Sequence, residues 1–493
     1  MNIDIVSSIH GGILLNINNF IYKKNKDLLR KTDGKHVFYW ICVNKCGAKI
    51  RTVETNEKKH ELDKNSTFFP DQHCHAPDPI GLKVRKIKEK IKMNAKNSIE
   101  DKPLQIYQKS INECSTIVAS HVSKNSVQQL VKRQRRNVEI YKEPKSIDEI
   151  CLAPTMCQTL KGELFLIKKN ENLLLFTTND NCKYLSESIC WLADGTFKAC
   201  PQIFEQMYVI HGSIKRGTDE IFVPLVFALM NGKSEELYNQ VFFLLNEFCL
   251  ENNINITQTN DLEIITDFEK AAINSLTENF PQATHSTCFF HLCQSIYRKI
   301  QNIGLSTKYA NDPEFNLLAR HLPAMAFLPV DRVQEGWAII KPLFGSNEEE
   351  QSLLKYFEHS YIIGRQVMKT RGRPRRESVY TPPLFPPELW SVAERLSTGL
   401  PRTTNTAESW HRKLNRLISP HPGLYKLIKT LQSTQNETEA VIEMLLYGRS
   451  NKKMKIQVQS HNIRLKEVQQ RLLADPGYDL LEYLRGIAQN LKF

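Results

Sequence analysis

The sequence has few cysteines, no long apolar run and no recognisable leader segment. Its 12 cysteines among 493 residues form no dense, regular framework, which excludes a scaffold held together by disulfides. No apolar run approaches the ~20 residues that a membrane-spanning helix needs. The first residues, MNIDIVSSIHGGILL, lack the basic region and the small-residue cleavage site of a signal peptide. We therefore expect neither a secreted nor a membrane protein, and collagen-like and coiled-coil chains are excluded as well.

The composition fits a soluble, multidomain protein of a reducing compartment. The length predicts two to four domains, and the hydrophobic content of 41% is enough for ordinary cores. Lys and Arg number 66 against 53 Asp and Glu, so the formal net charge is +13. This excess predicts a polyanionic partner, and the places where the charges cluster matter more than their sum.

Shifts in composition divide the chain into four predicted segments. Residues 1–80 contain short β-like runs separated by turn residues, as in a small antiparallel sheet. Residues 81–155 are a basic helical region. Residues 156–440 are an α/β domain with a mostly helical insertion at about 305–400, and residues 441–493 are a helical C-terminal region.

The basic helical region contains two candidate helices with clustered positive charge. The run GLKVRKIKEKIKMNAKNSI carries seven Lys or Arg residues and one Glu. The run SKNSVQQLVKRQRRNV predicts a Ser-capped helix that ends in a basic cluster, Lys132, Arg133, Arg135 and Arg136. Either the cluster contacts the DNA backbone, which its neighbours favour, or it is the solvated face of a linker helix.

Two cysteines and two histidines near the N-terminus predict a structural zinc site. Cys42 and Cys46 are separated by three residues, and His73 and His75 flank Cys74. Four such donors can surround one tetrahedral Zn²⁺, and a small domain with little core gains stability from a metal. In an extended His-x-His segment both imidazoles lie on one side, so Cys74 should point away. The alternative is four unrelated residues.

The runs YWICVNKCGAKIRT and HCHAPD resemble a FLYWCH-type zinc finger. The aromatic pair Tyr39 and Trp40, the two cysteines, the run 48–50 and the His-x-His carry the resemblance, with a shorter gap between the cysteines than the family has. The resemblance implies a module that binds either DNA or a protein partner, and both stay open.

Residues 160–300 alternate between predicted strands and helices. Three strands are followed by a helix, a strand and a second helix, which is the order of an RNase H-like fold. The strands are expected at 187–197, 205–214, 221–230 and 262–268, and the helices at 234–250 and 271–280.

Three acidic residues of this region have ordinary explanations when each is taken alone. Asp194 before Gly195 fits a hairpin turn, Asp267 fits a helix N-cap, and Glu408 fits a capping box begun at Asn405. Their joint placement favours a shared cleft, because the fourth strand of an RNase H-like sheet pairs beside the first. Carboxylates in one cleft repel unless cations hold them, so we expect two catalytic Mg²⁺ or Mn²⁺ ions.

The helix that carries Glu408 has two predicted faces. One is a buried stripe, and the other faces the cleft. The stripe contains Trp410, Leu414, Leu417 and Ile418, and the other face contains Glu408, His411, Arg412 and Asn415.

Four runs, ADGTFKACP, VPLVFALMNGKSEELYNQVF, ITDFEKAAINSL and RTTNTAESWHRKLN, resemble a Mutator-like element (MULE) transposase domain over roughly 150–440. The resemblance implies a DDE triad on an RNase H-like fold, in which Asp194 bridges both metals while Asp267 and Glu408 each complete one site. It also implies that Cys288 and His291 orient the active site or the DNA, a half-buried helical pair being the alternative. We do not expect a second zinc site there. His411, one turn from Glu408, is expected either to contact the scissile phosphate or to lie on a solvated face.

A basic loop at 369–376, KTRGRPRR, places five positive charges in eight residues. Its Arg-Gly-Arg-Pro core is that of an AT-hook, which inserts arginines into a narrow A·T minor groove. General phosphate contact and a merely soluble loop are the alternatives. The arginines concerned are Arg371, Arg373, Arg375 and Arg376.

Together these features predict a nuclear DNA transposase, or a protein derived from one, that cuts and joins strands by a two-metal mechanism. The alternatives are a domesticated zinc-finger regulator without turnover and a nuclease without strand transfer. The expected partners are DNA, protein partners of the finger and a second copy of the chain, with no membrane. The DNA target and the oligomeric state do not follow from the sequence.

Overall fold

The computed structural model describes most of the chain as two compact units, Met1–Lys142 and Glu143–Phe493. The described residues are 3–7, 12–55, 59–64, 66–67, 69–97, 101, 103–138, 143–257, 261–368, 378–448, 456–475 and 477–491. None of the helices in these ranges is both long and apolar enough to cross a membrane.

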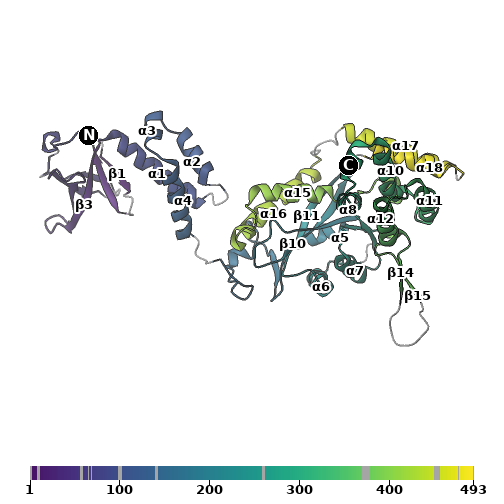
Figure 1. Ribbon diagram of the computed structural model, residues 1–493. Helices are drawn as coiled ribbons and strands as arrows, with labels where there is room; N and C mark the ends of the chain where they lie inside the picture. Colours follow the sequence, from purple (N-terminus) through teal and green to yellow (C-terminus); the bar gives the residue numbers. More distant parts are fainter. Residues whose placement is uncertain are drawn as a thin grey trace. The chain divides into compact units, whose positions relative to one another are not determined.

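The first unit begins with a six-stranded antiparallel sheet whose strands follow chain order, β1 to β6 (Figure 1). The strands are β1 Ile3–Ser7, β2 Ile13–Ile17, β3 Phe20–Leu29, β4 His36–Cys42, β5 Lys49–Glu54 and β6 His60–Leu62. Trp40 is completely buried at its centre, and its indole N–H donates to the hydroxyl of Thr52 at 2.8 Å. The small antiparallel sheet predicted for this end of the chain is confirmed.

Four helices with a core of their own follow the sheet. They are α1 Pro79–Asn97, α2 Pro103–Asn112, α3 Thr116–Ser120 and α4 Lys124–Val138. Apolar side chains of all four, among them Ile91 and Val127, pack together, while Leu82 of α1 joins a cluster with Val6 and Leu14 of the sheet. The helices therefore form a packed unit, and the boundary expected at 80/81 falls inside α1.

The second unit contains a seven-stranded mixed sheet in the order β13-β12-β9-β10-β11-β8-β7. Strands β9, β10 and β11 form an antiparallel meander, and β12 and β13 run parallel to β9 on its other side. The strands are β7 Leu166–Lys169, β8 Leu173–Phe176, β9 Cys190–Thr196, β10 Gln206–Arg216, β11 Asp219–Met230, β12 Glu263–Thr266 and β13 Thr284–Thr287. The four strands predicted in this region are confirmed, as is the pairing of the fourth with the first, whereas β7, β8 and β13 were not predicted.

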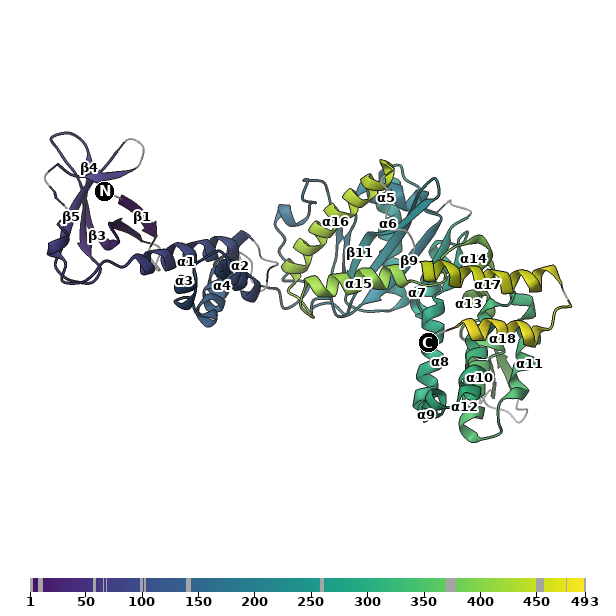
Figure 2. The same ribbon diagram turned by 90° about the horizontal axis from the view of Figure 1, so that it is seen from above.

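Helices cover both faces of this sheet (Figures 1 and 2). Trp191 and Ala193 of β9 pack in one cluster with α6 and α7, and the alternate residues Cys190 and Leu192 pack in another with Ala407 of α15. The covering helices are α5 Asn179–Glu187, α6 Glu235–Glu251, α7 Lys270–Asn279, α15 Asn405–Leu417 and α16 Leu424–Leu446. Because side chains alternate along a strand, Asp194 is placed on the α15 side.

The expected helical insertion is present and shares its core with the C-terminal helices. One cluster contains Phe327, Trp337 and Phe357 from the insertion together with Leu465 and Tyr483 from the C-terminal segment. The helices are α8 Phe289–Asn302, α9 Ser306–Asn311, α10 Pro313–Ala324, α11 Val333–Ile340, α12 Glu348–Phe357, α13 Pro387–Trp390, α14 Ala393–Thr398, α17 Ile456–Ala474 and α18 Leu480–Asn490, with a hairpin of β14 Arg365–Met368 and β15 Ser378–Thr381. The boundary expected at 440/441 falls inside α16.

Candidate functional site

Cys42, Cys46, His73 and His75 come together in the first unit, with one donor atom of each within 4.8 Å of the others. The Sγ of Cys42 lies 3.2 Å from Nε2 of His75, and the Sγ of Cys46 lies 3.3 Å from Nδ1 of His73. The chain turns through two left-handed residues here, Lys45 between the cysteines at φ 56° and Gly47 just after Cys46 at φ 86°. The four side chains form a possible metal site compatible with zinc.

The other ring nitrogens of the two histidines are held by neighbours. The hydroxyl of Tyr22 lies 2.7 Å from Nε2 of His73, and the carbonyl oxygen of Ala76 lies 2.9 Å from Nδ1 of His75. A hydrogen on Nδ1 of His75 would be accepted by the Ala76 carbonyl and would leave Nε2 as a lone-pair donor, while the side-chain nitrogen of Asn44 lies 3.2 Å from the same Nδ1. Phe20 also stacks on the His73 ring at 4.0 Å between centroids. Cys74 is exposed, so it does not share the site.

The ordinary explanations of the three carboxylates are wrong. Asp194 and Gly195 lie within β9 and not in a turn. The N-cap of α7 is Glu269, not Asp267. Helix α15 begins at Asn405, and its cap, Thr404, makes no side-chain capping bond, because its hydroxyl donates to the Sγ of Cys288 instead.

The sheet register brings Asp194 and Asp267 to the same level. Ile265 of β12 pairs in parallel with Leu192 of β9, so the residues two positions further on are Asp267 and Asp194. Burial and the negative charge of Asp194 raise the pKa of Asp267 above its ordinary value, while the nearby His291 and Lys233 oppose that rise. The two carboxylates are therefore close enough to repel.

Glu408 reaches the same place from α15. Its Oε1 lies 3.8 Å from Nε2 of His291, and donor atoms of Cys288, His291 and Glu408 lie within 4.8 Å of one another. Burial alone would lower the pKa of His291, but its hydrogen bond and electrostatic interaction with Cys288 and the charges of Asp267 and Asp194 raise it to about 9. Glu408 thus lies next to a histidine that also interacts with the charges of Asp267 and Asp194.

Helix α15 is turned differently from the predicted arrangement. Its buried residues include Ala407, His411 and Leu414, whereas Leu417 is 48% exposed. The alternative that His411 lies on a solvated face is wrong, and so is the predicted burial of Leu417. Nδ1 of His411 lies 3.2 Å from Oδ2 of Asp194, a polar contact that an apolar pattern cannot reveal.

Part of the second unit matches a known family. Residues 190–295 match the MULE transposase domain. The MULE match includes Asp194, Asp267, Cys288 and His291; Glu408 and the whole first unit lie outside it. It indicates a transposase or a protein derived from one. No curated protein matches the chain.

Three polar or aromatic features beside the MULE-matched carboxylates were missed by the sequence predictions. Burial and, after it, the negative charge of Asp267 raise the pKa of Glu269, while Lys233 opposes that rise. The ammonium of Lys233 lies 3.9 Å from the ring centroid of Phe197, which is 47% exposed. His211 is buried in β10, and burial lowers its pKa to about 3. The sequence could have indicated His211, because it is a histidine inside an otherwise apolar predicted strand.

The predicted basic residues differ in what they contact. Lys132 and Arg133 are exposed on α4, and the guanidinium of Arg135 donates to the backbone carbonyl of Asp101. Arg135 therefore ties helices of the first unit together. Arg136 also belongs to α4, and the four arginines of the 369–376 loop lie outside the described residues.

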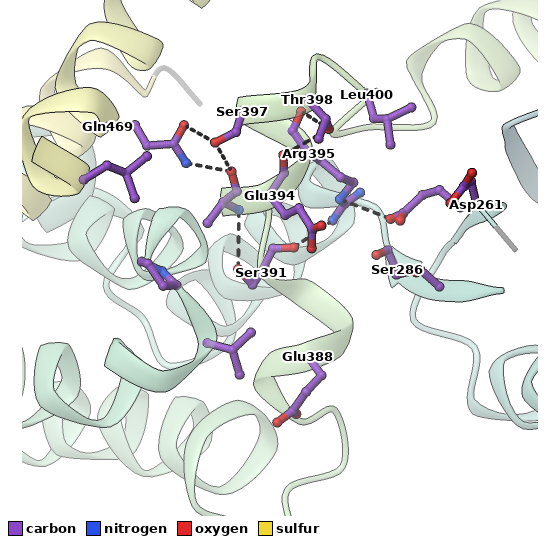
Figure 3. A pocket seen from close by; sticks show the side chains of 16 residues that line it. Asp261, Ser286, Glu388, Ser391, Glu394, Arg395, Ser397, Thr398, Leu400 and Gln469 are labelled. Carbon is purple, nitrogen blue, oxygen red and sulfur yellow. Dashed lines mark hydrogen bonds and ion pairs between the residues drawn. The ribbon is translucent and has the colours of Figure 1, made fainter. Parts of the chain in front are cut away.

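A pocket of about 560 Å³ lies at the beginnings of β12 and β13, whereas Asp267 follows the end of β12 (Figure 3). Arg395, which is buried, donates to the carbonyl oxygen of Thr287, and its Nε lies 3.6 Å from Oε1 of Glu263. The other charged side chains that line the pocket are acidic, Asp261, Glu388 and Glu394. Such a lining repels phosphate, so this pocket is not a DNA site.

Proposed function

We propose that the chain is a DNA transposase, or derives from one, and that it cuts and joins DNA strands at Asp194, Asp267 and Glu408. The observation that carries the proposal is the meeting of these carboxylates around His291 inside a segment that matches the MULE transposase domain. Two of them come from adjacent parallel strands and the third from a helix that packs on the same sheet.

The strand order supports an RNase H-like core. A meander of three antiparallel strands with two further strands parallel to the first, on its other side, is the order β13-β12-β9-β10-β11 of the second unit. In that fold the first and fourth strands are neighbours, as β9 and β12 are. A fold does not by itself give a function, so the proposal depends on the site.

The carboxylates fit hard divalent cations. Carboxylate oxygens are the ligands that Mg²⁺ and Mn²⁺ prefer. Burial and, after it, the charge of Asp194 raise the pKa of Asp267, and a cation would relieve the repulsion between the two carboxylates. Oε1 of Glu408 is buried and has no hydrogen-bond partner within the described part of the chain. Asp194 would hold both ions, and Asp267 and Glu408 one each. When bound, such ions would activate the attacking oxygen and stabilise the leaving oxygen.

The scissile phosphate would lie between α15 and the ends of β9 and β12, where Asp194 and Asp267 lie. In the first reaction the oxygen of water bonds to phosphorus, the bond from phosphorus to the 3′ oxygen breaks, and that oxygen leaves as a 3′-hydroxyl. In the second, this hydroxyl bonds to a target phosphorus and displaces a target 3′ oxygen, so one phosphodiester replaces another. Cys288 and His291 would orient Glu408 beside the phosphate.

We also propose that the first unit is a FLYWCH-type zinc finger followed by a basic helical region that binds DNA, and that the protein acts in the nucleus. The Cys2His2 geometry and the exposed Lys132 and Arg133 support this role. The alternative is that the finger binds a protein partner. In that case added DNA would not displace the partner from the finger.

A nicking assay on supercoiled and linear genomic DNA with Mg²⁺ tests the proposal. Wild-type protein should nick, and Asp194→Ala, Asp267→Ala and Glu408→Ala should each lose activity while the variants stay folded and DNA affinity changes little. Asp219→Ala, an exposed aspartate of the same sheet, is the matched control and should nick normally. A wild-type protein that binds DNA and never cuts, with Mg²⁺ or Mn²⁺, would replace the proposal with a non-catalytic regulator.

A further inference from the structure

Asp194 is held by a buried histidine of α15. Nδ1 of His411 lies 3.2 Å from Oδ2 of Asp194, and the two side chains are only 8% and 9% exposed. One turn earlier, Ala407 packs against Cys190 and Leu192 of β9. The helix is therefore fixed on the same strand that carries Asp194, and the contact between the two side chains is built into the packing.

The polarity of this contact follows from its surroundings. A carboxylate only accepts, so the Nδ1 of His411 that faces Oδ2 is the nitrogen suited to carry a hydrogen. The opposite nitrogen, Nε2, is buried and has no hydrogen-bond partner within the described ranges, and the His411 ring lies 5.2 Å from the Trp410 ring and 6.3 Å from the His211 ring, between centroids. A hydrogen on Nε2 would be a buried, unsatisfied donor, so Nδ1, which faces Asp194, is the better place for a ring hydrogen.

The packing behind His411 leaves its ring little room to move. Trp410 lies edge-on to His211 at 5.4 Å and against Phe227 at 5.7 Å, so α15 presses a layer of rings onto β10 and β11. His411 lies beside that layer and contacts Asp194, which favours a role that acts through the aspartate.

We propose that His411 is a positioning residue that fixes Asp194 for metal binding. Its Nδ1–H holds Oδ2 of Asp194 in one orientation and leaves the other carboxylate oxygen free to bind a cation. The inference rests on the proposed function, because that assigns Asp194 to the metals. Residues that orient a metal ligand in this way commonly contribute about 10- to 100-fold to metal affinity or activity.

Two replacements of similar size separate positioning from packing. His411→Asn keeps a side-chain N–H donor near the place of Nδ1, and His411→Leu fills the space without a donor. Mn²⁺ binding to the full chain, followed by the electron paramagnetic resonance signal of free Mn²⁺, is the principal measurement, with Asp194→Ala as the baseline. Thermal midpoints of all variants report the packing separately, and His411→Ala provides a second variant without a donor if the Leu variant does not fold.

We expect the Leu or Ala variant to bind Mn²⁺ about 10-fold or more weakly and the Asn variant to stay within about threefold of wild type. Equal affinities for the Asn and donor-free variants, or losses that simply follow the thermal midpoint, would overturn the positioning role. Wild-type protein that binds Mn²⁺ through Asp194 but cuts no DNA would refute the proposed function and leave the role of His411 standing. Wild-type protein that binds no Mn²⁺ above the Asp194→Ala baseline would refute both.

Discussion

Asp267→Asn should stabilise the second unit when no divalent cation has been added. Asp267 and Asp194 lie at the same level on adjacent strands, which are about 5 Å apart. Two unit charges at ~5 Å repel by about 3 kcal/mol at an effective dielectric constant near 20 and by about 1 kcal/mol in water. Asparagine removes one of these charges and keeps the shape, so we expect a gain of about 1 to 3 kcal/mol at pH 7.

The sign of the pH dependence follows from the raised pKa of Asp267. A carboxyl group whose folded pKa is raised destabilises the fold while it is charged, and this penalty disappears as the pH falls through the folded pKa. The advantage of Asp267→Asn should therefore be full at pH 7 and shrink as the pH approaches the ordinary value of 3.8. Added Mg²⁺ should raise the thermal midpoint of wild type more than that of the variant.

Thermal unfolding with and without Mg²⁺, followed by circular dichroism, measures both effects. Asp261→Asn is the control, because Asp261 is an exposed aspartate just before the same strand. A variant that is less stable than wild type at pH 7 without Mg²⁺, or that gains as much as wild type from Mg²⁺, would refute the reasoning.

Two further predictions concern metal and DNA binding. Elemental analysis should find about one zinc per chain, Cys46→Ser should lose it and unfold the finger, and Cys74→Ser should keep it; a finger that stays folded without metal would contradict the site. Replacing the four loop arginines by Gln should weaken DNA binding and reduce the slope of log affinity against log salt by about 3 to 4, whereas an unchanged slope would remove the loop from the interface. The arginines are Arg371, Arg373, Arg375 and Arg376.

The parts of the fold that the sequence predicted are those with a strong local pattern. The strands at 190–196 and 219–230 are apolar runs bounded by turns, and α6 has a Ser cap and a continuous apolar face. The short strands β7, β8 and β13 were missed, since four residues such as Leu173–Phe176 do not distinguish a strand from a buried helical turn.

The site was harder to predict than the fold, because its contacts are polar and distant in sequence. Residue types and spacing indicated Asp194, Asp267 and Glu408 as a set. The buried His411 contacts Asp194, which is 217 positions away, and a hydrophobic pattern treats such a histidine as a surface residue. Thr404 is a similar case, since its hydroxyl bonds Cys288 and so is unavailable as a cap.

In the first unit, too, the sequence predicted the site residues but not the contacts that position them. The cysteine and histidine spacing predicted the four donors that the structure brings together, but not the Tyr22 and Ala76 contacts that orient the imidazoles. Charge along α4 predicted an exposed basic cluster, and it gave no sign that Arg135 bonds the carbonyl of Asp101.

Mg²⁺-dependent nicking by wild-type protein, Asp194→Ala and Asp219→Ala on one DNA substrate tests the central claim most directly. The account predicts that wild type and Asp219→Ala nick at equal rates, and that Asp194→Ala binds the DNA with the same affinity without cutting it. Residual Mg²⁺-dependent cutting by Asp194→Ala at the wild-type rate would contradict it.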